Sequence, residues 1–105
     1  MISQIISKLP FINKEKTVDY YQNLGFGFVA DYGDYLIATY NNSEIHFFEF
    51  GSLIPEKSDF MIYLRISNNI DHFFEHIKEK NITIHPNGSL ETKPWGMREF
   101  SLIDP

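Results

Sequence analysis

The change of hydrophobic period along the chain constrains its fold more than any other feature. Residues 4–12 have the pattern of a strand, and a helical pattern follows to about Leu24, with Asn13 placed to begin the helix and Gly25 to end it. Three short strands then follow, over 26–30, 35–40 and 44–50. The first half of the chain is therefore predicted to have the order β-α-β-β-β.

The second half repeats this order of elements but ends one strand short. A strand over 61–66 precedes a helix that Asn68 caps, and strands follow over 82–85 and 97–103. Asp104-Pro105 resembles the start of a turn, so we expect a missing hairpin partner and an open sheet edge. The duplication rests on element order, since no strong residue-level repeat accompanies it. We predict an α+β fold with two modules, 1–52 and 60–105.

Size and composition indicate one globular domain. The chain has 105 residues, of which 43% are hydrophobic. No apolar run approaches the roughly 20 residues that span a bilayer, and the first residues lack the features of a signal peptide. The absence of cysteine excludes disulfides, thiolate nucleophiles and cysteine-based zinc sites. We expect a cytoplasmic protein.

The charge of the chain limits its partners. The formal net charge is −5, and lysine and arginine form no cluster, so nucleic acid is not an expected partner. An acidic surface favours a cationic ligand, although many soluble proteins carry such a charge for solubility alone.

One motif matches a known metal-binding pattern by its letters. His72-Phe-Phe-Glu-His76 has the H-x-x-E-H spacing of inverted zinc proteases. At about 100° per residue, both histidines lie opposite the apolar stripe of the helix and should face solvent. No third ligand is in view. The stripe consists of Ile70, Phe73, Phe74 and Ile77. We interpret the match as coincidence.

The strand over 44–50 places Glu44, His46 and Phe48 on one face. A carboxylate and an imidazole two positions apart are able to ligate a divalent metal. The favoured alternative is a strand whose polar residues face a wet groove or solvent. The next strand presents Tyr63 together with Arg65, which offer stacking and charge and not coordination.

The only tryptophan, Trp95, lies in a turn between Pro94 and Gly96. Its neighbours cannot bury the indole fully, so among the aromatic residues Trp95 is the best candidate for an exposed ligand platform, and a core position is the alternative.

Two motifs resemble the vicinal oxygen chelate superfamily of glyoxalases, bleomycin resistance proteins and dioxygenases. They are Val-Asp-Tyr-Tyr-x-x-Leu-Gly-Phe over 18–26 and Gly-Met-Arg-Glu-Phe-Ser-Leu-Ile-Asp-Pro over 96–105. The second is similar to a motif of the bleomycin resistance protein branch. The resemblance implies paired βαβββ modules that form a curved mixed sheet, the second module lacking its last strand.

The resemblance also gives an expectation about metal. The ligand positions of the metal-dependent members correspond to Ile6, Glu44 and Met61, with a fourth beyond Pro105. Of the three within the chain, only Glu44 has the right chemistry. We therefore expect no cofactor, and neither glyoxalase nor dioxygenase activity.

The implied function is sequestration of a cationic or aromatic ligand, such as a bleomycin-like glycopeptide, in a groove at the interface of a homodimer. This would confer antibiotic resistance without catalysis. One alternative is a metal-dependent lyase, isomerase or dioxygenase that uses Glu44 as a ligand, with His46 as a second candidate ligand. Another is an interaction module without a small ligand. The expected ligand-binding residues are Glu44, His46, Phe48, Tyr63, Trp95, Arg98 and Glu99.

Overall fold

The computed structural model describes residues 1–54, 57, 60–67, 69–86, 88–103 and 105. The chain divides into two compact units, unit 1 with residues Met1–Tyr63 and Pro105, and unit 2 with residues Leu64–Asp104. The division into modules 1–52 and 60–105 stays a prediction. Among the described residues, no helix is both long and apolar enough to cross a membrane.

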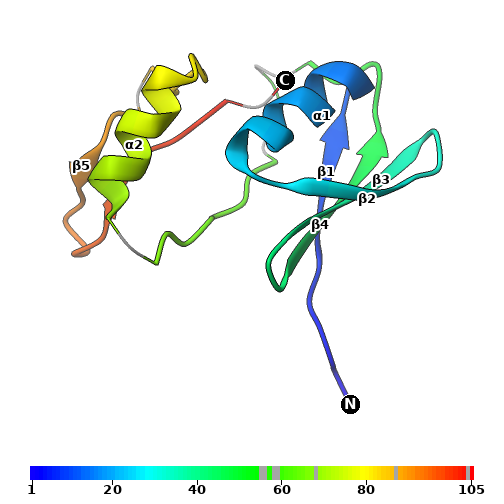
Figure 1. Ribbon diagram of the computed structural model, residues 1–105, viewed down its shortest axis with the longest axis horizontal. Coiled ribbons are helices and arrows are strands. Elements are labelled where there is room, and N and C mark those ends of the chain that lie inside the picture. The colour runs from blue at the N-terminus through cyan, green and yellow to red at the C-terminus, as the bar shows by residue number, and fades with distance from the viewer. Residues whose placement is uncertain (55–56, 58–59, 68, 87, 104) are drawn as a thin grey trace. The chain divides into compact units, whose positions relative to one another are not determined.

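Unit 1 contains a curved mixed sheet with one helix (Figure 1). The strand order is β1-β4-β3-β2, in which β1 runs parallel to β4 and the other neighbours are antiparallel. This confirms the predicted β-α-β-β-β order. The elements are β1 (Ser7–Phe11), α1 (Lys14–Leu24), β2 (Gly27–Asp31), β3 (Tyr35–Tyr40) and β4 (Ser43–Glu49).

Both ends of α1 form as predicted. The Asn13 side chain accepts a hydrogen bond from the Lys16 backbone N–H at 3.1 Å and so caps the first turn. At the other end, Gly25 has a φ of 108°, which is in the left-handed region, and the Phe26 N–H donates to the Tyr21 carbonyl at 2.9 Å. A glycine at this position ends the helix without the steric penalty of a Cβ atom.

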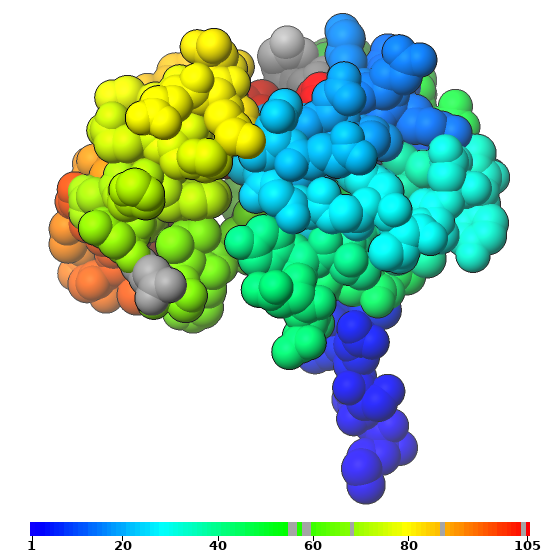
Figure 2. Space-filling view, in the orientation of Figure 1, coloured from blue at the N-terminus to red at the C-terminus, as the bar shows by residue number. Residues whose placement is uncertain are grey.

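The core of unit 1 lies between α1 and one face of the sheet. The Tyr21 ring of α1 is centred 4.8 Å from the ring of Phe47, which is completely buried. Leu36 and Ala38 on β3 are buried on the same face. The residues before β1, dark blue in Figure 2, extend away from this core, and the side chains of Met1, Ile2 and Ile5 are exposed.

The described residues of unit 2 form the helix α2 (Ile70–Glu79) and a two-stranded ribbon of β5 (Glu91–Thr92) and β6 (Arg98–Glu99). The strands predicted over 82–85 and 97–103 are present only in fragments. Ile84 and Leu102 form an isolated antiparallel bridge, next to which the His85 N–H donates to the Ser101 carbonyl at 2.8 Å.

The strand predicted over 61–66 is not formed. Its alternation is genuine, but alternation makes a strand only where a second backbone supplies hydrogen bonds along its length. Within the part of the chain that the structure describes, no strand pairs with this segment. Met61 and Tyr63, from the face expected to bind ligand, are 75% and 80% exposed.

The helix α2 begins one residue later than predicted. Asn68, the expected cap, lies outside the described residues, and Asn69 caps the helix by accepting from the backbone N–H three residues further on, at 3.1 Å. The apolar stripe faces inward as expected, since Ile77 is completely buried and Phe74 packs edge-on against Phe100, with 4.8 Å between the ring centroids.

Candidate functional site

The face of the unit 1 sheet opposite α1 carries the candidate site. Alternation in β4 turns Ile45 and Phe47 into the core and leaves Glu44, His46 and Phe48 partly accessible on the other face. We call this second side the open face. The sequence therefore predicted correctly which residues of this strand share a side.

A chain of hydrogen bonds crosses the open face from β3 to β4. The Tyr35 hydroxyl lies 2.7 Å from His46 Nδ1, and His46 Nε2 lies 2.5 Å from Glu44 Oε2. An ionised carboxylate only accepts hydrogen bonds, so Nε2 carries a proton that it donates to Glu44. In the neutral imidazole, Nδ1 then accepts from the Tyr35 hydroxyl. Each of the three side chains thus orients the next.

A shallow, open hollow of about 490 Å³ lies beside this chain of hydrogen bonds. The Tyr35 ring lies at its edge, and the Lys8 ammonium stands 5.3 Å from the centre of that ring. Aromatic, acidic and basic groups therefore meet in one small volume. We call it the Tyr35 hollow, and its lining consists of Lys8, Asp34, Tyr35, Phe48, Glu49 and Gly51.

Of the seven expected ligand-binding residues, three are brought together here. Glu44 and His46 are hydrogen-bonded, and Phe48 lines the adjacent hollow. Tyr63 also belongs to unit 1, but it lies in the segment that forms no strand. The pattern that grouped Tyr63 with a second strand face assumed a pairing that the structure lacks among the described residues.

The other three expected residues belong to unit 2. Trp95 lies in the turn between β5 and β6, where the Gly96 N–H donates to the Lys93 carbonyl at 2.9 Å, and its side chain is 64% exposed. This confirms the predicted exposure of the indole. Glu99 is half-buried and lies directly opposite Glu91 in the ribbon.

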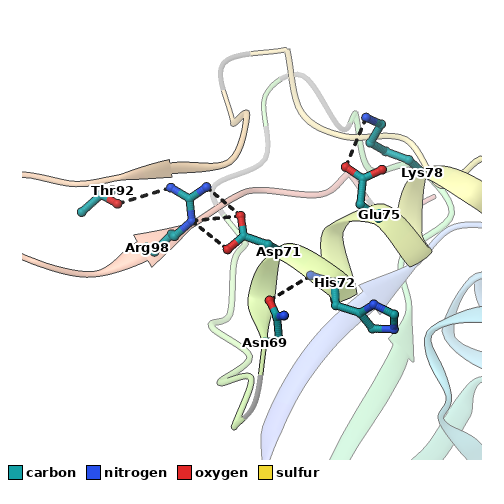
Figure 3. A network of polar contacts seen from close by, with 7 residues as sticks. All are labelled: Asn69, Asp71, His72, Glu75, Lys78, Thr92 and Arg98. Atoms are coloured by element: carbon teal, nitrogen blue, oxygen red, sulfur yellow. Dashed lines mark hydrogen bonds and ion pairs between the residues drawn. The ribbon is translucent and has the colours of Figure 1, made fainter.

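Arg98 is already engaged within unit 2, as Figure 3 shows. Its Nη2 and Nε donate to Asp71 of α2, at 2.7 Å and 3.2 Å to Oδ1, while Nη1 donates to the Thr92 hydroxyl at 3.3 Å. The guanidinium lowers the pKa of the Asp71 carboxyl, chiefly through these hydrogen bonds, and the carboxylate raises the pKa of Arg98 in return. Arg98 thus ties the helix to the ribbon.

Six of the seven expected binding residues therefore fall into two sets, one in each unit. Glu44, His46 and Phe48 form a group on the open face, and the ribbon carries Trp95, Arg98 and Glu99. That both sets contact one ligand stays a prediction.

The donor set does not suit a resident divalent metal. Among the described residues, no three histidine or acidic side chains cluster closely enough to hold an ion. Glu44 is the one suitable residue among the expected ligand positions, and one of its carboxylate oxygens already accepts a hydrogen bond from His46. His72 and His76 of the H-x-x-E-H motif are exposed, as predicted. A hard divalent ion requires several oxygen or nitrogen ligands at one point, and these residues do not provide them.

The sequence did not identify Lys8, Asp34, Tyr35 and Glu49 as candidates. A signal existed for Tyr35, since alternation along β3 puts it opposite the buried Leu36 and Ala38. No comparable signal in the sequence could show which residues of neighbouring strands lie opposite Tyr35 and Lys8. Tyr35 is paired with Phe48 and Lys8 with His46 only because of the register of three separate strands.

Comparisons with known proteins agree with the motifs. No family model matches the chain. Bleomycin resistance proteins of Geobacillus stearothermophilus and Staphylococcus aureus are 28% identical to it over 121 aligned residues, which cover 97% of this chain and 89% of theirs.

Solved structures show the same relationship. A bleomycin resistance determinant encoded on the transposon Tn5 has a TM-score of 0.86 at 27% identity, covering 99% of this chain and 90% of that one. A bleomycin-binding protein complexed with bleomycin has a TM-score of 0.85 at 27% identity, with 99% and 91% covered. A glyoxalase/bleomycin resistance protein/dioxygenase from Alicyclobacillus acidocaldarius, at 18% identity and a TM-score of 0.77, shares the fold over 98% of this chain and 83% of its own. In sequence and in fold, the chain is similar to bleomycin resistance proteins, and it shares its fold with a glyoxalase/bleomycin resistance protein/dioxygenase.

Proposed function

We propose that this protein binds and sequesters a cationic or aromatic small molecule of the bleomycin type, and leaves it chemically unchanged. The observation that carries the proposal is the similarity over 99% of the chain, at a TM-score of 0.85, to a bleomycin-binding protein solved with bleomycin. The open face adds chemistry of the right kind, since aromatic rings and carboxylates lie together there.

The groups on each unit have distinct roles in this proposal. Phe48 and the exposed Trp95 provide aromatic surfaces for stacking, while Glu44 and Glu99 attract a cation. His46 and Tyr63 donate or accept hydrogen bonds. Arg98 holds the ribbon that carries Trp95, because its three guanidinium nitrogens already donate to Asp71 and Thr92.

We propose further that ligand binding requires no resident metal. The support is the set of side chains at the expected metal positions, where Ile6 and Met61 offer no ligand for a hard divalent ion. Elemental analysis of purified protein tests this part. Stoichiometric zinc, nickel, manganese or iron that disappears in Glu44→Ala would instead support a metal-dependent lyase, isomerase or dioxygenase.

Two copies of the chain are proposed to pair, so that one ligand groove receives residues from both, in a cytoplasmic homodimer. The support is the apolar surface that residues 60–64 leave exposed, including Phe60, Met61 and Leu64. Light scattering on a size-exclusion column tests the pairing, and a single species of 12.3 kDa at high concentration would contradict it.

Titration with metal-free bleomycin tests the binding function, with the fluorescence of Trp95 as the signal. We expect a saturable change, and recovery of intact bleomycin by mass spectrometry after the protein is denatured. Glu44→Gln should weaken binding because it removes a charge from the open face. Glu15→Gln, the same change on the exposed first turn of α1, is the matched control. No fluorescence or calorimetric change up to millimolar ligand would refute the bleomycin proposal.

A further inference from the structure

The lining of the Tyr35 hollow combines aromatic and acidic residues, which suit an organic cation. Tyr35 and Phe48 line the hollow and contribute apolar surface, and its lining includes two acidic residues, Asp34 and Glu49, against one lysine, Lys8. Neither carboxylate forms a hydrogen bond or ion pair with any other described side chain. The two acids therefore remain available to a ligand.

A cation already stands at this position in the protein itself. The Lys8 ammonium lies 5.3 Å from the centre of the Tyr35 ring, within the distance at which a cation is attracted to an aromatic face. Lys8 comes from β1, whose pairing with β4 places it beside His46 on the open face. Lys8 is an exposed residue, so little besides the Tyr35 ring holds its side chain at this position.

The ring itself is held in place. The Tyr35 hydroxyl is bonded to His46 Nδ1 at 2.7 Å, and the His46 ring is fixed in turn by Glu44. A ring with a fixed orientation loses less freedom when a ligand packs on it than a mobile one does. The hydrogen-bonded chain thus keeps one face of Tyr35 ready for a cation.

We propose that the Tyr35 hollow is a subsite for an organic cation, such as a substituted ammonium or amidinium group attached to an apolar chain, and that Lys8 occupies the cation position until the ligand displaces it. The inference deepens the proposed function, because the subsite would take the cationic part of the sequestered molecule. An alkylated cation is less strongly hydrated than the lysine ammonium, which favours the exchange. Two acidic residues and one lysine line the hollow, so the net formal charge of its lining is negative, which favours an incoming cation.

Choline and its neutral isostere 3,3-dimethyl-1-butanol are suitable probes, observed through the amide chemical shifts of the unmodified full chain. Choline should shift the signals of Tyr35, Phe48 and Glu49 in a saturable way at millimolar concentration. The neutral alcohol should bind more weakly, because it has the same shape without the charge. Equal binding of the two probes, or choline shifts confined to other residues, would overturn the proposal.

Substitution of Lys8, whose ammonium is proposed to compete with the ligand for the Tyr35 ring, gives a sharper test. Lys8→Met should tighten choline binding by about tenfold, because it frees the ring face and removes a positive charge. Lys78→Met is the matched control, since Lys78 stands 5.5 Å from the Phe74 ring in unit 2, and it should leave choline binding unchanged. Tyr35→Leu should abolish binding, while Tyr35→Phe keeps the ring and should retain most of it. Unchanged or weaker choline binding in Lys8→Met would contradict the proposal that Lys8 occupies the cation position in the free protein.

Bleomycin titrations of the same variants separate this inference from the proposed function. Choline binding at the hollow without any bleomycin binding would sustain the subsite and refute the proposed ligand. Bleomycin binding that neither Lys8→Met nor Tyr35→Leu alters would refute the subsite and leave the proposed function standing.

Discussion

The two units begin from similar local signals and reach different structures. Each has an asparagine that caps a helix, followed by segments with the alternation of strands. In unit 1 these segments form a four-stranded sheet, whereas the regular strands of unit 2 are two residues long. The difference teaches that alternation specifies which side of a strand faces a core, but not whether a partner strand is present.

The two helices also differ, because the one with the more regular apolar pattern buries fewer residues. The apolar stripe of α2 is the cleaner one in sequence, yet Ile77 is its only described residue that is fully enclosed. The helix α1 has a less regular pattern and buries Thr17, Tyr21 and Leu24. The number of residues that a helix buries depends on the size of the surface packed against it. The four-stranded sheet of unit 1 is a larger surface than the two-stranded ribbon of unit 2.

The largest expected difference between the units is in their cores. Phe47→Ala should lower the free energy of unfolding by about 4 kcal/mol, because it removes a completely buried ring that packs against Tyr21 and Phe28. Ile77→Ala should cost about 2–3 kcal/mol, since a smaller side chain is lost.

Urea denaturation followed by far-ultraviolet circular dichroism measures both variants, and Trp95 fluorescence reports on unit 2 separately. Val29→Ala, at an exposed position of β2, is the control and should change stability little. A loss below about 1 kcal/mol for Phe47→Ala would contradict the core assigned to unit 1.

A smaller contrast concerns two glycines in the left-handed region. Gly25→Ala should destabilise by about 2 kcal/mol, because it adds conformational strain and its Cβ would lie 2.8 Å from the Tyr40 ring. Gly96→Ala brings the same kind of strain at a φ of 88° but meets no atom within 4 Å, so about 1 kcal/mol is expected. Equal losses in thermal or urea denaturation would show that the Tyr40 ring moves aside freely.

The smallest effects concern the exposed ion pairs. The pKa of Asp31 is lowered first by the Gly33 backbone N–H and then by Lys14, whereas for Asp71 the first cause is Arg98. Arg98→Gln should therefore raise the pKa of Asp71 nearly to its ordinary value of 3.8. Lys14→Gln should leave the pKa of Asp31 below that value, because the Gly33 hydrogen bond remains.

Carboxyl chemical shifts followed against pH measure both changes. Each folded-state pKa lies below the ordinary value, so each contact stabilises the fold above that value and loses its effect as the pH falls through the folded-state pKa. A pKa for Asp71 that does not respond to Arg98→Gln would show that the contact between α2 and the ribbon is absent in solution.

How much of the fold could be predicted depended on how local its determinants are. Asn13 and Gly25 set the ends of α1 by hydrogen bonds and a backbone angle within a few residues, and the sequence located both. The segment 61–66 has an equally regular pattern, but a strand depends on a distant backbone, and the prediction failed there.

The sequence by itself determined the order of elements in unit 1, the shared side of Glu44, His46 and Phe48, the exposure of Trp95 and the resemblance to bleomycin resistance proteins. These features follow from the periodicity of the apolar residues, from turns formed within a few residues, and from short sequence motifs. Only the tertiary structure decided that Tyr35 reaches His46 and that Lys8 stands over the Tyr35 ring. The register between β1, β4 and β3 sets those contacts, and register is fixed by the packing of whole strands and not by the residues that meet.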